Sequence, residues 1–155
     1  MNEQEISIVA FRQEDAADFR TINLEWLDKY GLTEAPDLLV LNDPQGEIID
    51  KGGAIFLAKS EGVVVGTAAL MKETPIQYEL VKMGVVDAYK GKGISKMLME
   101  ACLKQAKVFG AKRVYLQSNS QLKTAIGLYE KYGFKHIPVQ DAHYVTADVM
   151  MELLL

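Results

Sequence analysis

Hydrophobic positions alternate with polar ones, or run together, in several short segments of this chain, and they recur at helical spacing in longer segments. The short segments predict strands over Ile6 to Phe11, Ala54 to Lys59, Val63 to Met71, Tyr78 to Val86, Arg113 to Gln117, Phe134 to Val139 and Val145 to Leu153. The helical spacing predicts helices over Asp15 to Tyr30, Gly93 to Gly110 and Gln121 to Tyr132. This order predicts an α/β or α+β fold, in which helices cover the faces of a mixed sheet.

The connections between these elements differ in composition. Ser60-Glu61-Gly62 joins two apolar runs and is typical of a hairpin turn. The stretch from Leu32 to Gly53 has two prolines, three glycines and five acids, so we expect a loop with at most one helical turn. In the last strand, the odd-numbered positions from Val145 to Leu153 are apolar, which predicts that one face is buried more deeply than the other.

Length and composition limit the class of protein. With 155 residues, 49% of them hydrophobic, we expect one globular domain over residues 1–155. A net charge of −4 argues against a general nucleic-acid-binding surface. Cys102 is the only cysteine and is expected to pack in the core, and no Cys/His cluster has metal-ligand spacing. Because residues 1–5 are polar and no apolar run reaches the ~20 residues of a membrane span, we expect a soluble, cytoplasmic protein without metal or membrane partner.

A glycine-rich turn stands between the fourth predicted strand and the second predicted helix. Its sequence is Lys90-Gly91-Lys92-Gly93-Ile94-Ser95, and the first N–H groups of the following helix have no intrahelical partner. Together with the helix dipole, these N–H groups suit a phosphate or pyrophosphate. The spacing fits neither a Walker loop nor a dinucleotide fingerprint, which would need glycine where Lys96 stands.

Two sequence motifs follow one another at a separation of about 35 residues. The first is Val86-Asp87-Ala88-Tyr89-Lys90-Gly91-Lys92-Gly93-Ile94-Ser95, and the second is Ala125-Ile126-Gly127-Leu128-Tyr129-Glu130-Lys131-Tyr132-Gly133-Phe134. Both resemble motifs of the Gcn5-related N-acetyltransferase (GNAT) superfamily, and the resemblance is best from Tyr78 to Leu153. Two positions depart from it, since the family has Arg or Gln at Lys90 and Gly or Ala at Ser95. Lys90 keeps the positive charge but lacks the planar guanidinium fork.

The resemblance implies a GNAT-like fold: a mixed, mostly antiparallel twisted sheet of about seven strands, flanked by helices and with a splayed central strand pair. It also implies an N-acetyltransferase in which a primary amine attacks acetyl-CoA directly in a ternary complex. We expect a small-molecule amine or an amino acid as acceptor. The alternatives are a protein or peptide amine and a non-catalytic acyl-CoA-binding module. The apolar tail Leu153-Leu154-Leu155 indicates a covered C-terminus and leaves a homodimer open.

The resemblance also implies a set of residues that contact coenzyme A. These cofactor-binding candidates are Met83, Gly84, Val85, Lys90, Gly91, Lys92, Gly93, Ile94, Ser95, Lys96, Asn119 and Tyr129. The N–H groups of the turn would hold the pyrophosphate, and the strand around Gly84 would pair with the pantetheine arm. The alternatives are a tight turn alone for Gly91 and Gly93, close packing for Gly84, and a helix cap for Asn119.

Tyr129 and Glu79 are the candidates for proton transfer. Tyr129 matches a tyrosine of the family motif and would hydrogen-bond or protonate the leaving thiolate, and the alternative is plain core packing. Glu79 is the candidate base, with an exposed structural carboxylate as the alternative. Tyr78, His143 and Tyr144 are its rivals.

The N-terminal half is expected to bind the acceptor. Trp26 and Tyr30 of the first predicted helix are the candidate substrate-binding residues. The five acids between Gly31 and Gly53 stand against one lysine, so we expect them to attract a cationic amine. The alternative is a solvated loop.

Overall fold

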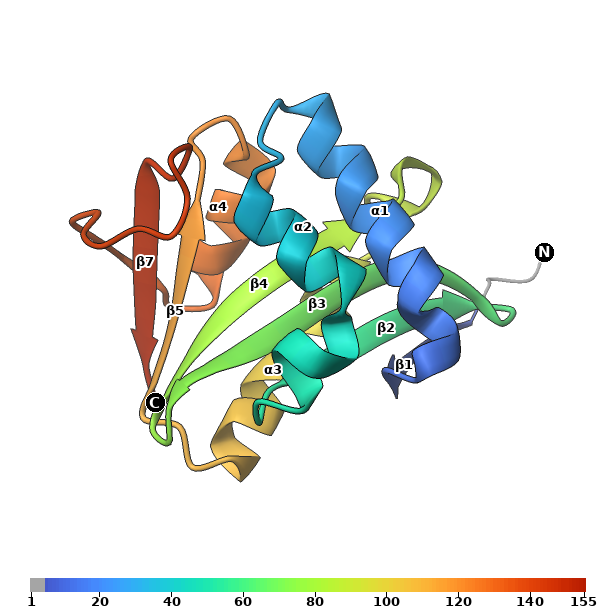
Figure 1. Ribbon diagram of the computed structural model, residues 1–155, viewed down its shortest axis with the longest axis horizontal. Coiled ribbons are helices and arrows are strands. Elements are labelled where there is room, and N and C mark those ends of the chain that lie inside the picture. The colour runs from blue at the N-terminus through green and yellow to red at the C-terminus, as the bar shows by residue number, and fades with distance from the viewer. Residues whose placement is uncertain (1–4) are drawn as a thin grey trace.

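One sheet of seven strands runs through the computed structural model, which describes residues 5–155 (Figure 1). The strands are β1 (Ile6–Ala10), β2 (Ala54–Ser60), β3 (Val63–Thr74), β4 (Gln77–Val85), β5 (Arg113–Ser118), β6 (Lys135–Ile137) and β7 (Val149–Leu154). Their spatial order is β1-β2-β3-β4-β5-β7-β6, and every neighbouring pair is antiparallel except β4 and β5. The predicted GNAT-like sheet is therefore confirmed.

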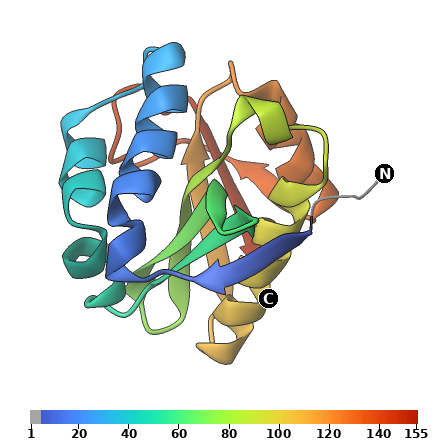
Figure 2. The same cartoon turned by 90° about the vertical axis from the view of Figure 1, so that its right-hand side faces the viewer.

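Helices cover both faces of this sheet (Figure 2). α1 (Ala16–Lys29) and α2 (Ala35–Asn42) lie on one face, and α3 (Ile94–Val108) and α4 (Lys123–Lys131) lie on the other. Three short helical turns are η1 (Gln13–Asp15), η2 (Gln45–Ile49) and η3 (Asp87–Tyr89). Cys102 lies on the buried face of α3, as expected, and burial raises the pKa of its thiol to about 12. Within residues 5–155 no helix is both long enough and apolar enough to cross a membrane.

The stretch from residue 32 to 53, predicted as a loop with at most one helical turn, is largely helical. α2 begins after Glu34, whose backbone N–H donates to the Asp37 carboxylate at 2.9 Å. Pro36 lies in the first turn of α2 and Pro44 precedes η2, positions where a missing N–H does no harm. Val40, Leu41 and Ile48 are buried against the sheet. The prediction was wrong because these prolines start helical turns instead of breaking them.

The C-terminal strands are shorter than predicted. β6 ends at Ile137, and β7 begins at Val149 because the residues before it form a loop in which Val145 is 96% exposed. Within β7 the predicted one-sided burial is confirmed, since Val149, Met151 and Leu153 belong to the core cluster under α3 while Leu154 on the other face is 69% exposed. Met150, at 7% exposed, is the buried residue of that other face. In the apolar tail, Leu154 and Leu155 are exposed, so the chain itself does not cover them.

β4 leaves β5 in the middle of the sheet. Their parallel pairing joins only Gln77, Tyr78 and Glu79 to residues 113–115. Beyond Glu79, β4 continues beside β3 with a register shift, and Lys82 has a positive φ of 53°. Such a β-bulge bends a strand and re-aims its side chains. The predicted splayed strand pair is thereby confirmed, and it leaves an opening in the sheet.

A buried chain of hydrogen bonds holds this bulge. The Thr67 hydroxyl of β3 donates to the Lys82 carbonyl at 2.7 Å and accepts from Asn23 Nδ2 at 3.0 Å. Asn23 Oδ1 in turn accepts from the indole N–H of Trp26 at 3.0 Å. Because Asn23 and Thr67 are 0% exposed, leaving any of these groups unpaired would be costly. The chain ties α1, β3 and the bulge of β4 together.

Thr67→Val removes the hydroxyl but keeps the β-branched shape. We expect the free energy of unfolding to fall by about 1–3 kcal/mol, because the Lys82 carbonyl and the Asn23 amide lose a buried partner. Urea denaturation followed by circular dichroism measures this change. Thr21→Val on the exposed side of α1 is the matched control and should stay within about 0.5 kcal/mol of the parent. Equal stability of the two variants would contradict this role of Thr67.

Candidate active site

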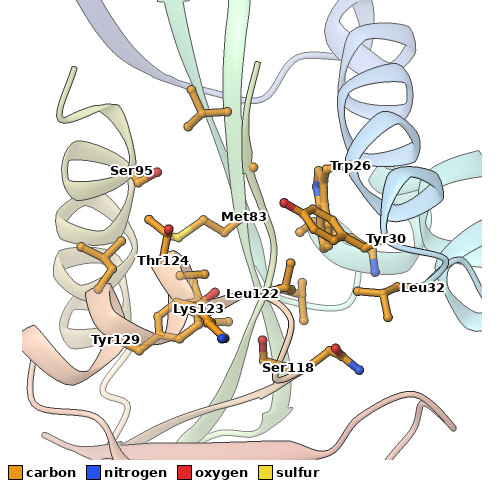
Figure 3. Close-up of a pocket in the computed structure, with 18 of the residues that line it drawn as sticks. Trp26, Tyr30, Leu32, Met83, Ser95, Ser118, Leu122, Lys123, Thr124 and Tyr129 are labelled. Atoms are coloured by element: carbon orange, nitrogen blue, oxygen red, sulfur yellow. The ribbon is translucent and has the colours of Figure 1, made fainter. Parts of the chain in front are cut away.

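A cavity of about 740 Å³ opens where β4 and β5 part (Figure 3). Ser95 and Tyr129 lie on the side of α3 and α4, Trp26 and Tyr30 lie across from them at the C-terminal end of α1, and Met83 of β4 lies between. This volume is within the range of ~300–1,000 Å³ that is usual for small-molecule and cofactor sites. Every predicted site residue lines the cavity except Lys92.

The glycine turn forms one end of the cavity. Gly91 and Gly93 both have φ of +78°, a left-handed conformation that glycine adopts at little cost. A Cβ at either position would meet nothing within 4 Å, so backbone conformation and not crowding requires glycine here. The Met97 N–H makes the first intrahelical bond of α3, to the Gly93 carbonyl. The N–H groups of residues 94–96 therefore remain for an anion.

The two lysines of the turn contact neighbouring side chains. Lys90 lines the cavity, and its Nζ lies 2.9 Å from the Asp87 carboxylate. The hydrogen bond from Lys90 lowers the pKa of Asp87, so this carboxyl group is ionised at neutral pH. Lys92 Nζ lies 4.9 Å from the centre of the Tyr89 ring and points its charge at that ring. The positive charge at Lys90 is thus partly offset before any ligand binds.

Gly84 lies where Trp26 approaches β4. A Cβ at Gly84 would lie 2.6 Å from Trp26 Nε1, so close packing requires glycine at this position. Gly84 and Val85 pair with β3, and in the described part of the chain β4 makes no pairing with β5 beyond Glu79. The packing interpretation of Gly84 is therefore supported, and the edge of β4 that faces the cavity is still open to a ligand.

Tyr129 lines the cavity and also packs in the core. It is 8% exposed, and its ring centre lies 5.9 Å from that of Phe134. Burial raises the pKa of its phenol to about 12, so the hydroxyl stays protonated at neutral pH. Asn119 also lines the cavity. Its side chain donates a hydrogen bond to the Thr146 carbonyl at 2.8 Å and accepts one from the Gln121 N–H at 3.0 Å, so it caps the following turn as well.

Glu79 is buried in the cavity wall and is not an exposed acid at a strand end. It is 3% exposed, accepts a hydrogen bond from Gln117 Nε2 at 2.9 Å, and has His143 Nδ1 3.7 Å away. Burial raises the pKa of Glu79, although His143 and Gln117 oppose this shift. Gln117 Oε1 also accepts from the backbone N–H of His143 at 2.8 Å, which orients the amide. A buried carboxylate of raised pKa in a cavity wall has the properties of a general base.

The three rivals of Glu79 lie in different surroundings. Tyr78 is stacked on Phe109 in the α3 core, with ring centres 5.1 Å apart, and does not line the cavity. His143 is half exposed and lines a separate cavity of about 250 Å³. Tyr144 lines the main cavity, where burial raises the pKa of its phenol. Tyr144 is therefore the rival that shares the cavity with Glu79.

The five acids between residues 31 and 53 form hydrogen bonds or ion pairs within the chain. Glu34 accepts hydrogen bonds from the Val145 N–H at 2.8 Å, the Thr146 N–H at 3.0 Å and the Thr146 hydroxyl. Burial opposes ionisation of Glu34, but these hydrogen bonds outweigh it and lower the pKa of the carboxyl. The remaining contacts are Asp37 with Lys82, Asp43 with the Gly46 N–H, Glu47 with Lys51, and Asp50 with Gln45. Glu34 and Asp37 thus link distant segments, while the other three acids make exposed local contacts. Of the five acids, Asp37 alone lines the main cavity, which does not support the expectation that the group attracts a cationic amine.

The cavity wall contains a buried ion pair that the sequence pattern did not indicate. Lys82 Nζ lies 2.5 Å from Asp37 Oδ1 and 3.5 Å from the Tyr144 hydroxyl oxygen, and all three residues line the cavity. A single cation inside the apolar run of β4 was the one signal in the sequence. Asp37 and Tyr144 stand 45 and 62 residues from Lys82, so no local pattern connects them.

Comparison with known proteins gives the class of this protein as an N-acetyltransferase. The chain belongs to the acetyltransferase (GNAT) family, whose model matches residues 12–134. It is 36% identical over 116 residues to the uncharacterized N-acetyltransferase YjgM of Escherichia coli, and this match covers 70% of each chain. It is also 35% identical over 103 residues to human N-acetylaspartate synthetase, covering 66% of this chain and 34% of that one. The crystal structure of the PaiA N-acetyltransferase of Thermoplasma acidophilum in complex with coenzyme A matches with a TM-score of 0.80 and 20% identity, covering 97% of this chain and 99% of that one.

Gly84→Ala is expected to destabilise the protein by about 1–3 kcal/mol, because the new methyl group overlaps the Trp26 indole. The matched control is Gly127→Ala in α4, where a Cβ meets nothing within 4 Å. Alanine favours a helix by roughly 1 kcal/mol over glycine, so this control should gain stability. Thermal or urea denaturation of both variants should therefore give changes of opposite sign. A Gly84→Ala variant as stable as the parent would contradict the close packing.

Proposed function

We propose that this protein transfers the acetyl group of acetyl-CoA to a primary amine of a small molecule by direct attack in a ternary complex. The observation that carries the proposal is that one cavity joins the glycine turn, the open edge of β4 and the buried Glu79 carboxylate. An anionic cofactor and an amine can therefore approach each other through the opening in the sheet.

The residues at the turn suit coenzyme A. The free N–H groups at the start of α3 face the cavity, and Lys90 and Lys96 add positive charge beside them. The edge of β4 from Met83 to Val85 offers backbone groups to the amides of the pantetheine arm, as in the addition of a strand to a sheet. The coenzyme A in the related PaiA structure supports this assignment. When bound, acetyl-CoA supplies an acetyl group activated as a thioester.

The proton balance assigns tasks to Glu79 and Tyr129. A bond forms between the amine nitrogen and the acetyl carbon, and the bond from that carbon to sulfur breaks. The ammonium gives up two protons: one leaves through Glu79 to water, and one ends on the sulfur. Because the Tyr129 pKa of about 12 exceeds the ~8.5 of a thiol, full transfer from the phenol costs about 5 kcal/mol at 1.36 kcal/mol per unit. Tyr129 therefore acts by hydrogen bonding to the sulfur as charge develops there.

A small acceptor is favoured over a peptide. The contacts between Glu34 and residues 145–146 join the start of α2 to the C-terminal loop, next to the cavity, where a bound peptide would need an open groove. The relative named N-acetylaspartate synthetase supports a small acceptor as well. A non-catalytic acyl-CoA-binding module would have no use for a buried carboxylate beside the cofactor site.

Release of free thiol from acetyl-CoA, measured with amines, amino acids and peptides, tests the proposal. We expect turnover with small amines, and we expect acetyl-CoA to raise the melting temperature because it binds only the native state. Tyr129→Phe should lower kcat by about a hundredfold and retain the thermal shift. Tyr132→Phe, which does not line the cavity, is the matched control. A thermal shift without turnover of any acceptor would favour the non-catalytic module.

The pH dependence of kcat/KM should report the protonation of Glu79. Burial raises the pKa of this carboxyl above its ordinary value of 4.5, and only its ionised form accepts a proton. We therefore expect activity to fall with decreasing pH through a midpoint above 4.5, and Glu79→Gln to remove this limb together with most of the rate. Glu73→Gln is the control: the Glu73 charge raises the pKa of Glu79, so this variant should keep the limb and move it to lower pH. An unchanged profile in Glu79→Gln would assign the base elsewhere.

A further inference from the structure

Lys82 is buried in the cavity wall and has a strained backbone conformation. In a regular strand Lys82 would share the α3 face of the sheet with Leu80, while Glu79 and Val81 share the other face. Its left-handed φ of 53° turns it instead to the α2 side, where it meets Asp37. Both a left-handed non-glycine residue and a buried ammonium cost free energy. Residues held in this way are concentrated at functional sites.

The Lys82 ammonium keeps a donor for a ligand. An ammonium has three N–H donors, and the contacts within residues 5–155 use two: Asp37 Oδ1 at 2.5 Å and the Tyr144 hydroxyl oxygen at 3.5 Å. The Tyr144 phenol stays neutral because burial raises its pKa, so its O–H also remains a donor. Asp37 is held from its other side, since Oδ2 accepts from the Glu34 N–H at 2.9 Å. Lys82 and Tyr144 thus present two donors at one place in the cavity.

Glu79 provides the opposite charge in the same cavity. It stands three residues before Lys82 on β4, and the bulge brings both side chains to the same side of the sheet. The two groups are close enough that the Lys82 charge lowers the pKa of Glu79 against the effect of burial. A carboxylate and an ammonium side by side are complementary to a ligand that carries an ammonium and a carboxylate on one carbon.

We propose that the acceptor is a free α-amino acid, bound as a zwitterion. Lys82 Nζ and the Tyr144 hydroxyl bind its carboxylate, and Glu79 receives its amine. This inference rests on the proposed function and deepens it, because it names the substrate class and a specificity-determining residue. Such a site distinguishes free amino acids from amines that lack a carboxylate. It also distinguishes them from peptides, in which the carboxyl group next to the free α-amine forms a peptide bond and carries no charge.

The test compares acceptors that differ only in the carboxylate, for example leucine, leucinamide and isoamylamine, and extends the comparison to other side chains. With the parent protein, kcat/KM for the best amino acid should exceed that for its amide and its amine by about tenfold to a hundredfold, the usual effect of a buried hydrogen bond to a charged group. Lys82→Met should raise KM for the amino acid by that factor and lower the ratio of kcat/KM for the amino acid to that for the matched amine by about the same factor. Lys104→Met on the exposed side of α3 is the matched control and should change neither.

Tyr144→Phe carries the same comparison if Lys82→Met does not fold, since it removes one donor and leaves the ion pair intact. Melting-temperature shifts with the same ligands test the inference without turnover. A shift with the amino acid that is absent with the amine and lost in the variant supports it, even if thiol release fails and the proposed function falls. The inference is overturned if the amine or a peptide is as good a ligand as the amino acid. It is also overturned if Lys82→Met lowers kcat/KM for all three acceptors equally, because Lys82 would then stabilise the fold without contributing to specificity.

Discussion

The hydrogen bond from the Thr67 hydroxyl to the Lys82 carbonyl holds the bulge on which the site depends. It fixes β4 to β3 at the position where the register shifts, just beyond the last pairing of β4 with β5 at Glu79. A regular β4 would stay hydrogen-bonded to β5 and close the sheet. The bulge instead opens the sheet, frees the edge of Met83 to Val85, and turns Lys82 towards α2. One backbone irregularity thereby creates the passage, the strand edge and the position of a charged group.

The charges around the opening are arranged so that each end of the cavity has its own chemistry. At the turn, the backbone N–H groups and the lysines favour an anion, and the Asp87 carboxylate partly offsets the charge of Lys90. At the other end, Lys82 is paired with Asp37, while Glu79 lies beside the half-exposed His143 and accepts a hydrogen bond from the Gln117 amide. Since burial disfavours the charged form of a carboxyl, Glu79 retains a tendency to take up a proton. Burial likewise raises the pKa of the Tyr129 phenol, so this group keeps its proton at neutral pH.

The part of the site that sequence reasoning found is local in the chain. The two glycines of the turn, the helix start and Tyr129 belong to short motifs, and the structure places them all at the cavity. Glu79 was found as a candidate, but its burial was not, because Gln117 and His143 reach it from 38 and 64 residues away. The pair of Lys82 and Asp37 was missed for the same reason. Helix α2 was missed because proline was weighed as a breaker, although at a first helical turn it fits the required φ.

Helix α2 braces the acceptor end of the cavity from two sides. Asp37 in its first turn holds Lys82 of the sheet, and Glu34 just before it holds the backbone of residues 145 and 146. These links join segments that are 45 and more than 100 residues apart, so the wall becomes rigid only when the whole chain has folded. The backbone N–H of Glu34 also donates to Asp37, which couples the two links through one helix start. A brace of this kind fixes Lys82 and Tyr144 relative to Glu79 before a ligand arrives, and such preorganisation reduces the entropy lost on binding.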